Sequence, residues 1–139
     1  MDPQPYDNLS NQDLCALCVW REARGEGSIG KRGVAHVILN RMNHGGYGGS
    51  DVHGVVLKPY QFSSFLESDP NSELWPLDED ALWIDSQQAA QAVLLGFDTD
   101  ITAGALFYFS RPLTEPPSAW GPVGVTLVVG HLTFCKPVL

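Results

Sequence analysis

The sequence is short of cysteine and of basic residues. It holds three cysteines in 139 residues, and its eight lysines and arginines stand against sixteen acidic residues. Three cysteines cannot close a disulfide framework, so we expect reduced thiols. Cys15 and Cys18 have the C-x-x-C spacing of a zinc or redox motif, but no second pair follows. We expect them to be small core residues on one helix face.

Long apolar runs are also missing, and the charge is one-sided. The net charge of −8 disfavours nucleic acid and anionic membrane surfaces as main partners. Nowhere do eighteen apolar residues run together, and the first twenty show no basic start followed by an apolar run. We therefore expect no membrane span and no signal peptide. The four histidines include no i, i+4 pair and no HExxH motif, so we expect no metal.

Length and patterning predict one domain after a short arm. Residues 1–9 contain two prolines and no periodicity, which predicts a loose N-terminal arm. Apolar residues make up 44% of the whole chain, which is enough for a single core, and we expect residues 10–139 to form one domain. Small residues at Gly30 and Gly33 would let their helix pack closely on a neighbour.

The predicted elements make the domain α+β. Apolar spacing and cap residues predict four helices, at about residues 10–24, 28–43, 51–57 and 79–95. Runs of β-branched and aromatic residues predict two short strands, at residues 105–109 and 123–129. The domain is therefore mainly helical, with a small β element toward the C-terminus.

Glu22 is the most informative single residue. Its spacing of four from Cys18 and eight from Leu14 places it on the apolar stripe of the first helix, near the stop at Gly25. Burial and the negative end of the helix dipole both favour the protonated acid there, which suits a general acid. The alternative is an ordinary surface glutamate at a fraying helix end.

Five sequence blocks occur in a fixed order: EARGE at Glu22, GVAHVILNR at Gly33, VVLKPYQFS at Val55, GALFY at Gly104, and Trp120. In order and spacing they resemble the SleB-type cell-wall hydrolases, a family of spore-cortex-lytic and phage or bacterial peptidoglycan-cleaving enzymes. The resemblance implies a lysozyme-like domain that cuts peptidoglycan glycan strands between N-acetylmuramic acid and N-acetylglucosamine. It further implies a lytic transglycosylase with one catalytic glutamate, which falls on Glu22. From the residues themselves, which show no metal or nucleophile motif, we expect no cofactor.

The resemblance also suggests residues that bind the glycan. Gln61, Phe62 and Ser63 match a segment that lines the groove in the family, and Tyr108 and Trp120 match aromatic positions. Amide and hydroxyl groups can bond sugar hydroxyls, and aromatic faces pack on the C–H faces of sugar rings. Core packing is the alternative for Phe62 and Tyr108. We expect residues 58–66 and 104–120 to form the groove walls.

Some positions depart from the family or have simpler explanations. Arg21 stands where the family has a small residue, and we expect it to point away from Glu22, because adjacent helical positions diverge by about 100°. Asn40 and Arg41 end the second helix, where capping its carbonyls is the default role. Leu132 occupies the position of a family histidine, so we assign no role to His131.

Other functions remain open. A second carboxylate beside Glu22 would make the enzyme a hydrolytic N-acetylmuramidase; the candidates are Glu26, Asp51, Asp98 and Asp100. A non-catalytic glycan-binding or phage structural module is a further alternative. Because cell walls are often anionic, we expect basic side chains such as Arg24, Lys58 or Arg111 to face the glycan. We expect a monomer that acts on the wall after release from the cytoplasm, or as a virion-associated protein.

Overall fold

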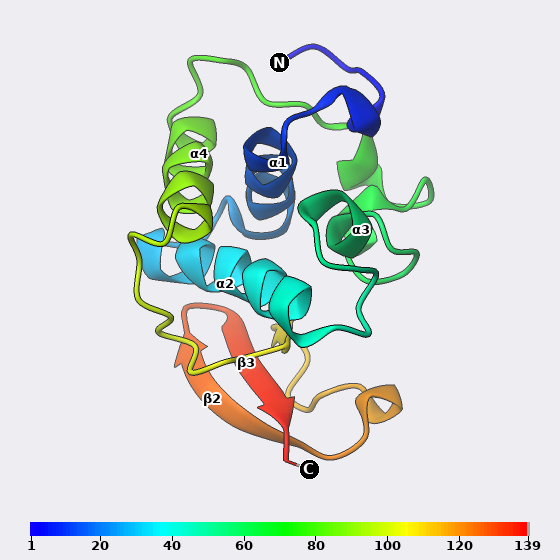
Figure 1. The fold of residues 1–139 in the computed structure, drawn as a ribbon, viewed down its shortest axis with the longest axis vertical. Coiled ribbons are helices and arrows are strands. Elements are labelled where there is room, and N and C mark those ends of the chain that lie inside the picture. Colours follow the sequence, from blue (N-terminus) through cyan, green and yellow to red (C-terminus); the bar gives the residue numbers. More distant parts are fainter. Residues whose placement is uncertain (139) are drawn as a thin grey trace.

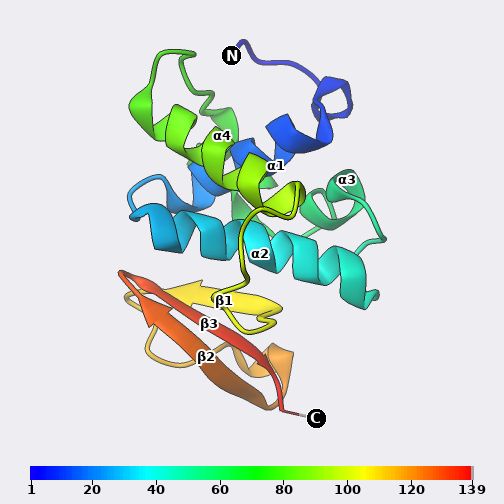
Figure 2. The same ribbon diagram turned by 60° about the vertical axis from the view of Figure 1, so that its left-hand side comes forward.

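The structure is a computed structural model that describes residues 1–138. Its four α-helices are α1 (Asn11–Ala23), α2 (Ser28–His44), α3 (Val52–Val56) and α4 (Ala81–Leu94). Its strands are β1 (Phe107–Ser110), β2 (Val123–Val129) and β3 (Leu132–Pro137). The helices lie together at one end of the molecule and the sheet at the other, with α2 between α1 and the sheet (Figures 1 and 2). The α+β prediction is confirmed.

Polar caps set where the helices begin. The Ser10 hydroxyl accepts from the Asp13 N–H at the start of α1, and the Asp51 carboxylate accepts from the Gly54 N–H at the start of α3. Such caps satisfy N–H groups that have no partner within the helix. The prediction for α4 was two residues early, because its cap is Asp80, which accepts from Leu82 N–H.

The sheet has one strand more than the sequence predicts. Its order is β1-β3-β2, with both pairings antiparallel, so the unpredicted strand β3 is the central one. A two-residue turn joins β2 to β3, and Gly130 adopts a positive φ of 58° there. Leu132 and Phe134 are buried while Thr133 between them is half-buried, which is the alternation of a strand with one covered face.

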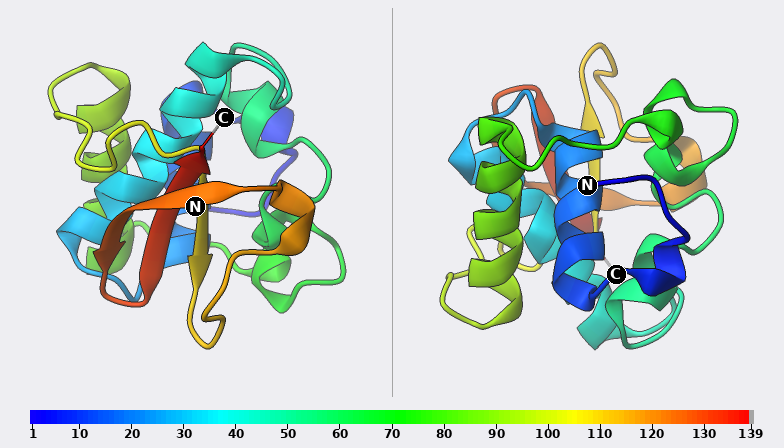
Figure 3. Two further views of the ribbon diagram at one scale, coloured as in Figure 1. Left: turned by 90° about the horizontal axis from the view of Figure 1, so that it is seen from below. Right: turned by 90° about the horizontal axis from the view of Figure 1, so that it is seen from above.

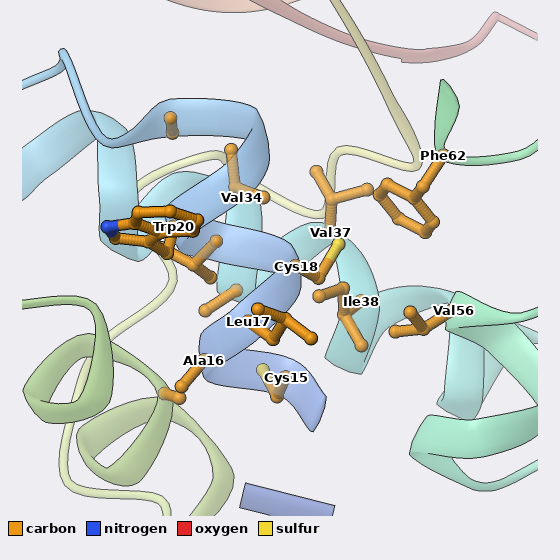
Figure 4. Packing of buried hydrophobic residues seen from close by; sticks show 14 of the residues in the cluster. Cys15, Ala16, Leu17, Cys18, Trp20, Val34, Val37, Ile38, Val56 and Phe62 are labelled. Atoms are coloured by element: carbon orange, nitrogen blue, oxygen red, sulfur yellow. The ribbon is translucent and has the colours of Figure 1, made fainter. Parts of the chain in front are cut away.

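Helix α1 forms the centre of the core. Seen from above, it lies between α4 on one side and the segments around α3 on the other (Figure 3). Its residues from Leu14 to Trp20 are all buried, and Leu17 and Cys18 pack among Val37 and Ile38 of α2 (Figure 4). The three cysteines are free and buried, and Cys15 and Cys18 are the core residues that the sequence predicts. Burial raises the pKa of the Cys15 thiol to about 12, so this thiol stays neutral.

Residues 1–9 follow the surface of the domain. Tyr6 lies in a short 3-10 turn, stacks on Trp75 at 5.8 Å between ring centroids and accepts a hydrogen bond from Arg21. Leu9 is buried in the core. Within residues 1–138, no helix has both the length and the apolar character needed to cross a membrane.

The absence of a side chain at Gly33 lets α2 lie close to the sheet. A Cβ atom there would stand 2.5 Å from the Phe134 ring of β3. Phe134 is itself fully buried, so the ring has little freedom to move aside. The close packing expected from the small residues of this helix is therefore confirmed.

We predict that Gly33→Ala lowers the free energy of unfolding. Alanine is the better helix former by about 1 kcal/mol, but overpacking a rigid core costs about 1–3 kcal/mol, and we expect the clash to outweigh the propensity. Chemical denaturation measures the difference. Gly25→Ala is the control, because its Cβ would meet nothing within 4 Å. A Gly33→Ala protein as stable as that control would show that α2 and β3 are not in close contact.

Candidate active site

A groove runs beside the C-terminal end of α1, with a cavity volume of about 430 Å³. Glu22, in the last turn of α1, lines it. One wall carries Tyr60, Gln61 and Ser63, and the other runs from Tyr108 to Trp120. The two walls fall within residues 58–66 and 104–120, as the sequence predicts. This volume suits a small-molecule or sugar-sized site.

Two donors hold the half-buried carboxylate of Glu22. The Tyr108 hydroxyl donates to Oε1 at 2.5 Å, and the Ser64 N–H donates to Oε2 at 3.3 Å. Burial, followed by the nearby Glu22 charge, raises the pKa of the Tyr108 phenol well above its usual range, so the phenol keeps its proton and remains a donor. Glu22 is thereby fixed in one orientation, with the groove in front of it.

Four of the five predicted glycan-binding residues line the groove. They are Gln61, Ser63, Tyr108 and Trp120. Phe62 does not line it: its side chain is 2% exposed and packs beneath the groove, 6.5 Å from Tyr108 between ring centroids. A ring that is sealed from solvent cannot stack on a sugar, so the placement of Phe62 against substrate is wrong. It supports the groove from below.

Arg21 points away from Glu22, as predicted. It is 3% exposed and donates to the backbone carbonyls of Ser72 and Leu74. It also donates to the Ser64 carbonyl at 3.4 Å. Arg21 therefore fixes the irregular segment whose Ser64 N–H contacts the Glu22 carboxylate.

Arg41 and Asn40 do not cap α2, and that interpretation is wrong. Asn40 donates to the Ala105 carbonyl and to Asp100, whereas Arg41 donates to the Leu106 carbonyl. Both side chains reach the chain that leads into β1. Arg41 also lines the groove, which makes it a site residue that the sequence reasoning missed. Its place in the GVAHVILNR block was the available signal.

The other candidate carboxylates lie outside the groove. Asp98 pairs with Arg32 and His36, and Asp100 accepts from Asn40 and Thr102. The remaining two, Asp51 and Glu26, respectively cap α3 and brace the β2–β3 turn. Among residues 1–138, Glu22 is the one carboxylate that lines this groove.

The predicted basic contacts to the glycan are not found in the groove. Arg24 stacks on Trp20 and bonds Asn71, and Lys58 donates to the Gly46 carbonyl. Arg111 is exposed outside the lining. The cation that does line the groove is Arg41. No group of three metal-ligating side chains occurs in the part of the chain that the structure describes.

Glu26 holds the β2–β3 turn against the end of α1. It accepts from the His131 N–H at 2.7 Å and from His131 Nδ1 at 3.0 Å. Burial alone would raise the pKa of Glu26, but the hydrogen bonds and charge of His131, with a further contribution from Arg111, lower it below its usual range. The folded state therefore favours the ionised form of this side chain.

We predict a pH-dependent stability contribution from Glu26. A carboxyl group whose pKa is lowered by folding stabilises the protein above its unfolded-state pKa, about 4.3, and loses that effect as the pH falls through the lower folded-state value. The free energy of unfolding of wild type should therefore exceed that of Glu26→Gln at pH 6, and the gap should close on acidification toward pH 3. A gap that is constant with pH would contradict an ionised Glu26.

Comparisons with known proteins identify the family of the chain. The family profile described as Cell Wall Hydrolase matches residues 25–135. A spore cortex-lytic enzyme of Bacillus subtilis (strain 168) is 32% identical over 131 residues, covering 92% of this chain and 39% of that protein. Its counterpart in Oceanobacillus iheyensis is 30% identical, covering 96% and 44%. The chain spans less than half the length of these curated relatives.

Solved structures give the same result. The catalytic domain of the germination-specific lytic transglycosylase SleB from Bacillus anthracis aligns with a TM-score of 0.71 and 27% identity, covering 96% of this chain and 100% of that one. The corresponding domain of the Bacillus cereus SleB protein aligns with a TM-score of 0.69 and 26% identity, covering 98% and 100%. In fold, the protein is therefore of the class of SleB-like catalytic domains.

The extent of the profile match shows to which family the chain belongs. It covers most of the chain, from before the start of α2 through β1 and β2 into β3. The chain belongs to the Cell Wall Hydrolase family.

Proposed function

We propose that this protein cleaves the glycan strands of peptidoglycan between N-acetylmuramic acid and N-acetylglucosamine, as a lytic transglycosylase. One observation carries the proposal: of the carboxylates in residues 1–138, Glu22 alone lines a sugar-sized groove, and it is held there by Tyr108 and Ser64. The names of the related spore cortex-lytic enzymes and of the SleB catalytic domain support it.

The geometry fits a reaction with one acid–base group. Protonated Glu22 donates its proton to the glycosidic oxygen, and the bond from that oxygen to the muramic C1 breaks. Glu22, now a carboxylate, takes the proton of the muramic 6-hydroxyl. The 6-hydroxyl oxygen bonds to C1 at the same time and closes an anhydro ring. The residue ends protonated again, ready for another cycle.

The groove favours this reaction over hydrolysis. An inverting hydrolase places a second carboxylate about 6.5–9.5 Å away to activate water, and a retaining one about 5–5.5 Å away as nucleophile. Glu26, Asp51, Asp98 and Asp100 all have other partners away from the groove. Around Glu22 the lining instead offers the hydroxyls of Tyr60, Ser63 and Tyr108 and the amide of Gln61, which can bond sugar hydroxyls.

Digestion of purified peptidoglycan tests the proposal. We expect turbidity to fall and soluble fragments to appear that contain sugars with their stem peptides still attached. Release of free peptides from intact strands would show that the enzyme cuts an amide bond. Absence of any soluble product, with binding to the wall retained, would favour a non-catalytic glycan-binding module.

A further inference from the structure

Arg41 is a buried cation at the wall of the groove. It is 4% exposed, yet it lines the same cavity as Glu22. The described residues provide no ion pair for it, and burial lowers the pKa of its guanidinium below the usual range, although the nearby Glu22 charge opposes that shift. A buried guanidinium without a paired carboxylate is costly, so a residue of this kind needs a reason beyond stability.

The guanidinium connects the two walls of the groove. Its Nε–H donates to the Leu106 carbonyl at 2.7 Å, one residue before β1, which carries Tyr108. Its Nη1 donates to the Gln61 side-chain oxygen at 3.4 Å. Tyr108 on one wall bonds Glu22, and Gln61 on the other lines the groove. One planar group thus sets the position of both relative to the acid.

Aromatic rings fix the plane of that group. The guanidinium carbon lies 5.0 Å from the Phe62 ring centroid, 5.5 Å from that of Tyr47 and 5.7 Å from that of Phe107. The buried Phe62 ring therefore helps to hold the Arg41 guanidinium in place. A lysine would keep the charge, but its ammonium is a point donor on a flexible stem and lacks a rigid planar fork.

We propose that Arg41 is a positioning residue for glycan cleavage, which aligns Tyr108 and Gln61 with Glu22 through the geometry of its guanidinium rather than through its charge. The inference rests on the proposed function. Arg41 takes no part in proton transfer itself. It acts through the Tyr108 hydroxyl, which orients the Glu22 carboxylate, and through the Gln61 amide, which lines the groove.

Steady-state digestion of soluble glycan strands by Arg41→Lys and Arg41→Met tests this proposal. Misplacing a catalytic group by about 1 Å costs about 10²-fold in rate, so we expect both variants to lose about that much kcat with a smaller change in KM. Equal losses identify geometry as the cause. Recovery of near-wild-type kcat in Arg41→Lys would overturn the proposal, because the charge alone would then suffice.

Asn40→Ala is the matched control. Asn40 is the adjacent residue of α2 and donates to the neighbouring Ala105 carbonyl at 3.0 Å, but it does not line the groove. We expect it to lower the unfolding temperature and to keep kcat near wild type when all proteins are assayed well below their transitions. An equal loss of kcat in Asn40→Ala, or failure of both Arg41 variants to fold, would make Arg41 a merely structural residue.

A double-mutant cycle gives a second readout. If Arg41 acts partly through the Tyr108 hydroxyl, its loss should cost less in a Tyr108→Phe background, so the two effects on kcat should not add. Full additivity would contradict the proposal. The outcomes also separate the two inferences: a wild-type enzyme that cleaves and depends on Glu22, with Arg41→Lys fully active, would refute only the role of Arg41.

Discussion

Glu22→Gln should reduce the rate of glycan cleavage by about 10²- to 10⁴-fold, the range that general acid–base catalysis contributes. Glutamine has nearly the same shape and its amide oxygen can still accept from Tyr108 or Ser64, so the groove should stay intact. The amide has no acidic proton to give to the glycosidic oxygen. We therefore expect kcat to fall and binding of the wall to change little, measured by loss of turbidity and by cosedimentation.

Glu26→Gln is the matched control for this experiment. Glu26 is the next glutamate along the chain, and its side chain bonds His131 rather than facing the groove. Its replacement should affect stability but leave kcat close to that of wild type. Equal losses in the two variants, or an undiminished rate in Glu22→Gln, would remove Glu22 from its assigned role.

Tyr108→Phe should reduce kcat by about 10²-fold, because it removes the hydrogen bond that orients the Glu22 carboxylate. The ring itself would remain, packed near Phe62 and Phe134, so we expect the fold to be preserved. KM should change less than kcat, since the lost hydroxyl acts on the acid. The measurement is initial rate against concentration of soluble glycan strands.

Tyr47→Phe provides the comparison for that variant. Tyr47 is another tyrosine that packs near Arg41, but it does not line the groove. Its hydroxyl should be dispensable. If Tyr108→Phe were as active as Tyr47→Phe, the contact between Tyr108 and Glu22 would have no part in catalysis.

Local sequence signals predicted the helices but not the whole sheet. Ser10 and Asp51 are strong caps whose side chains accept from the N–H group three residues on, so the starts of α1 and α3 could be found from nearby residues alone. Strand β3 depends on pairing with β1 and β2 on both sides. The alternation of buried and half-buried side chains around Phe134 is short, and it identifies a strand only when α2 is known to cover one face of the sheet. That knowledge comes from the tertiary structure.

The site residues, too, were only partly predictable from the sequence. The helix face and the family motif both indicated Glu22, because the position of a side chain on a helix follows from spacing alone. Phe62 and Arg41 were misplaced, since nothing local distinguishes a groove-lining ring from a buried one, or a helix-capping arginine from one that crosses to a strand. Leu106, the acceptor for Arg41, lies 65 residues further along the chain.

The most direct test of the central claim is digestion of peptidoglycan in water enriched in oxygen-18, followed by mass spectrometry of the new glycan ends. If Glu22 works alone and the muramic 6-hydroxyl captures the sugar, the products should end in anhydromuramic residues without heavy oxygen. Reducing ends that carry oxygen-18 would contradict this account, because water would then be the acceptor and a second group would have to activate it.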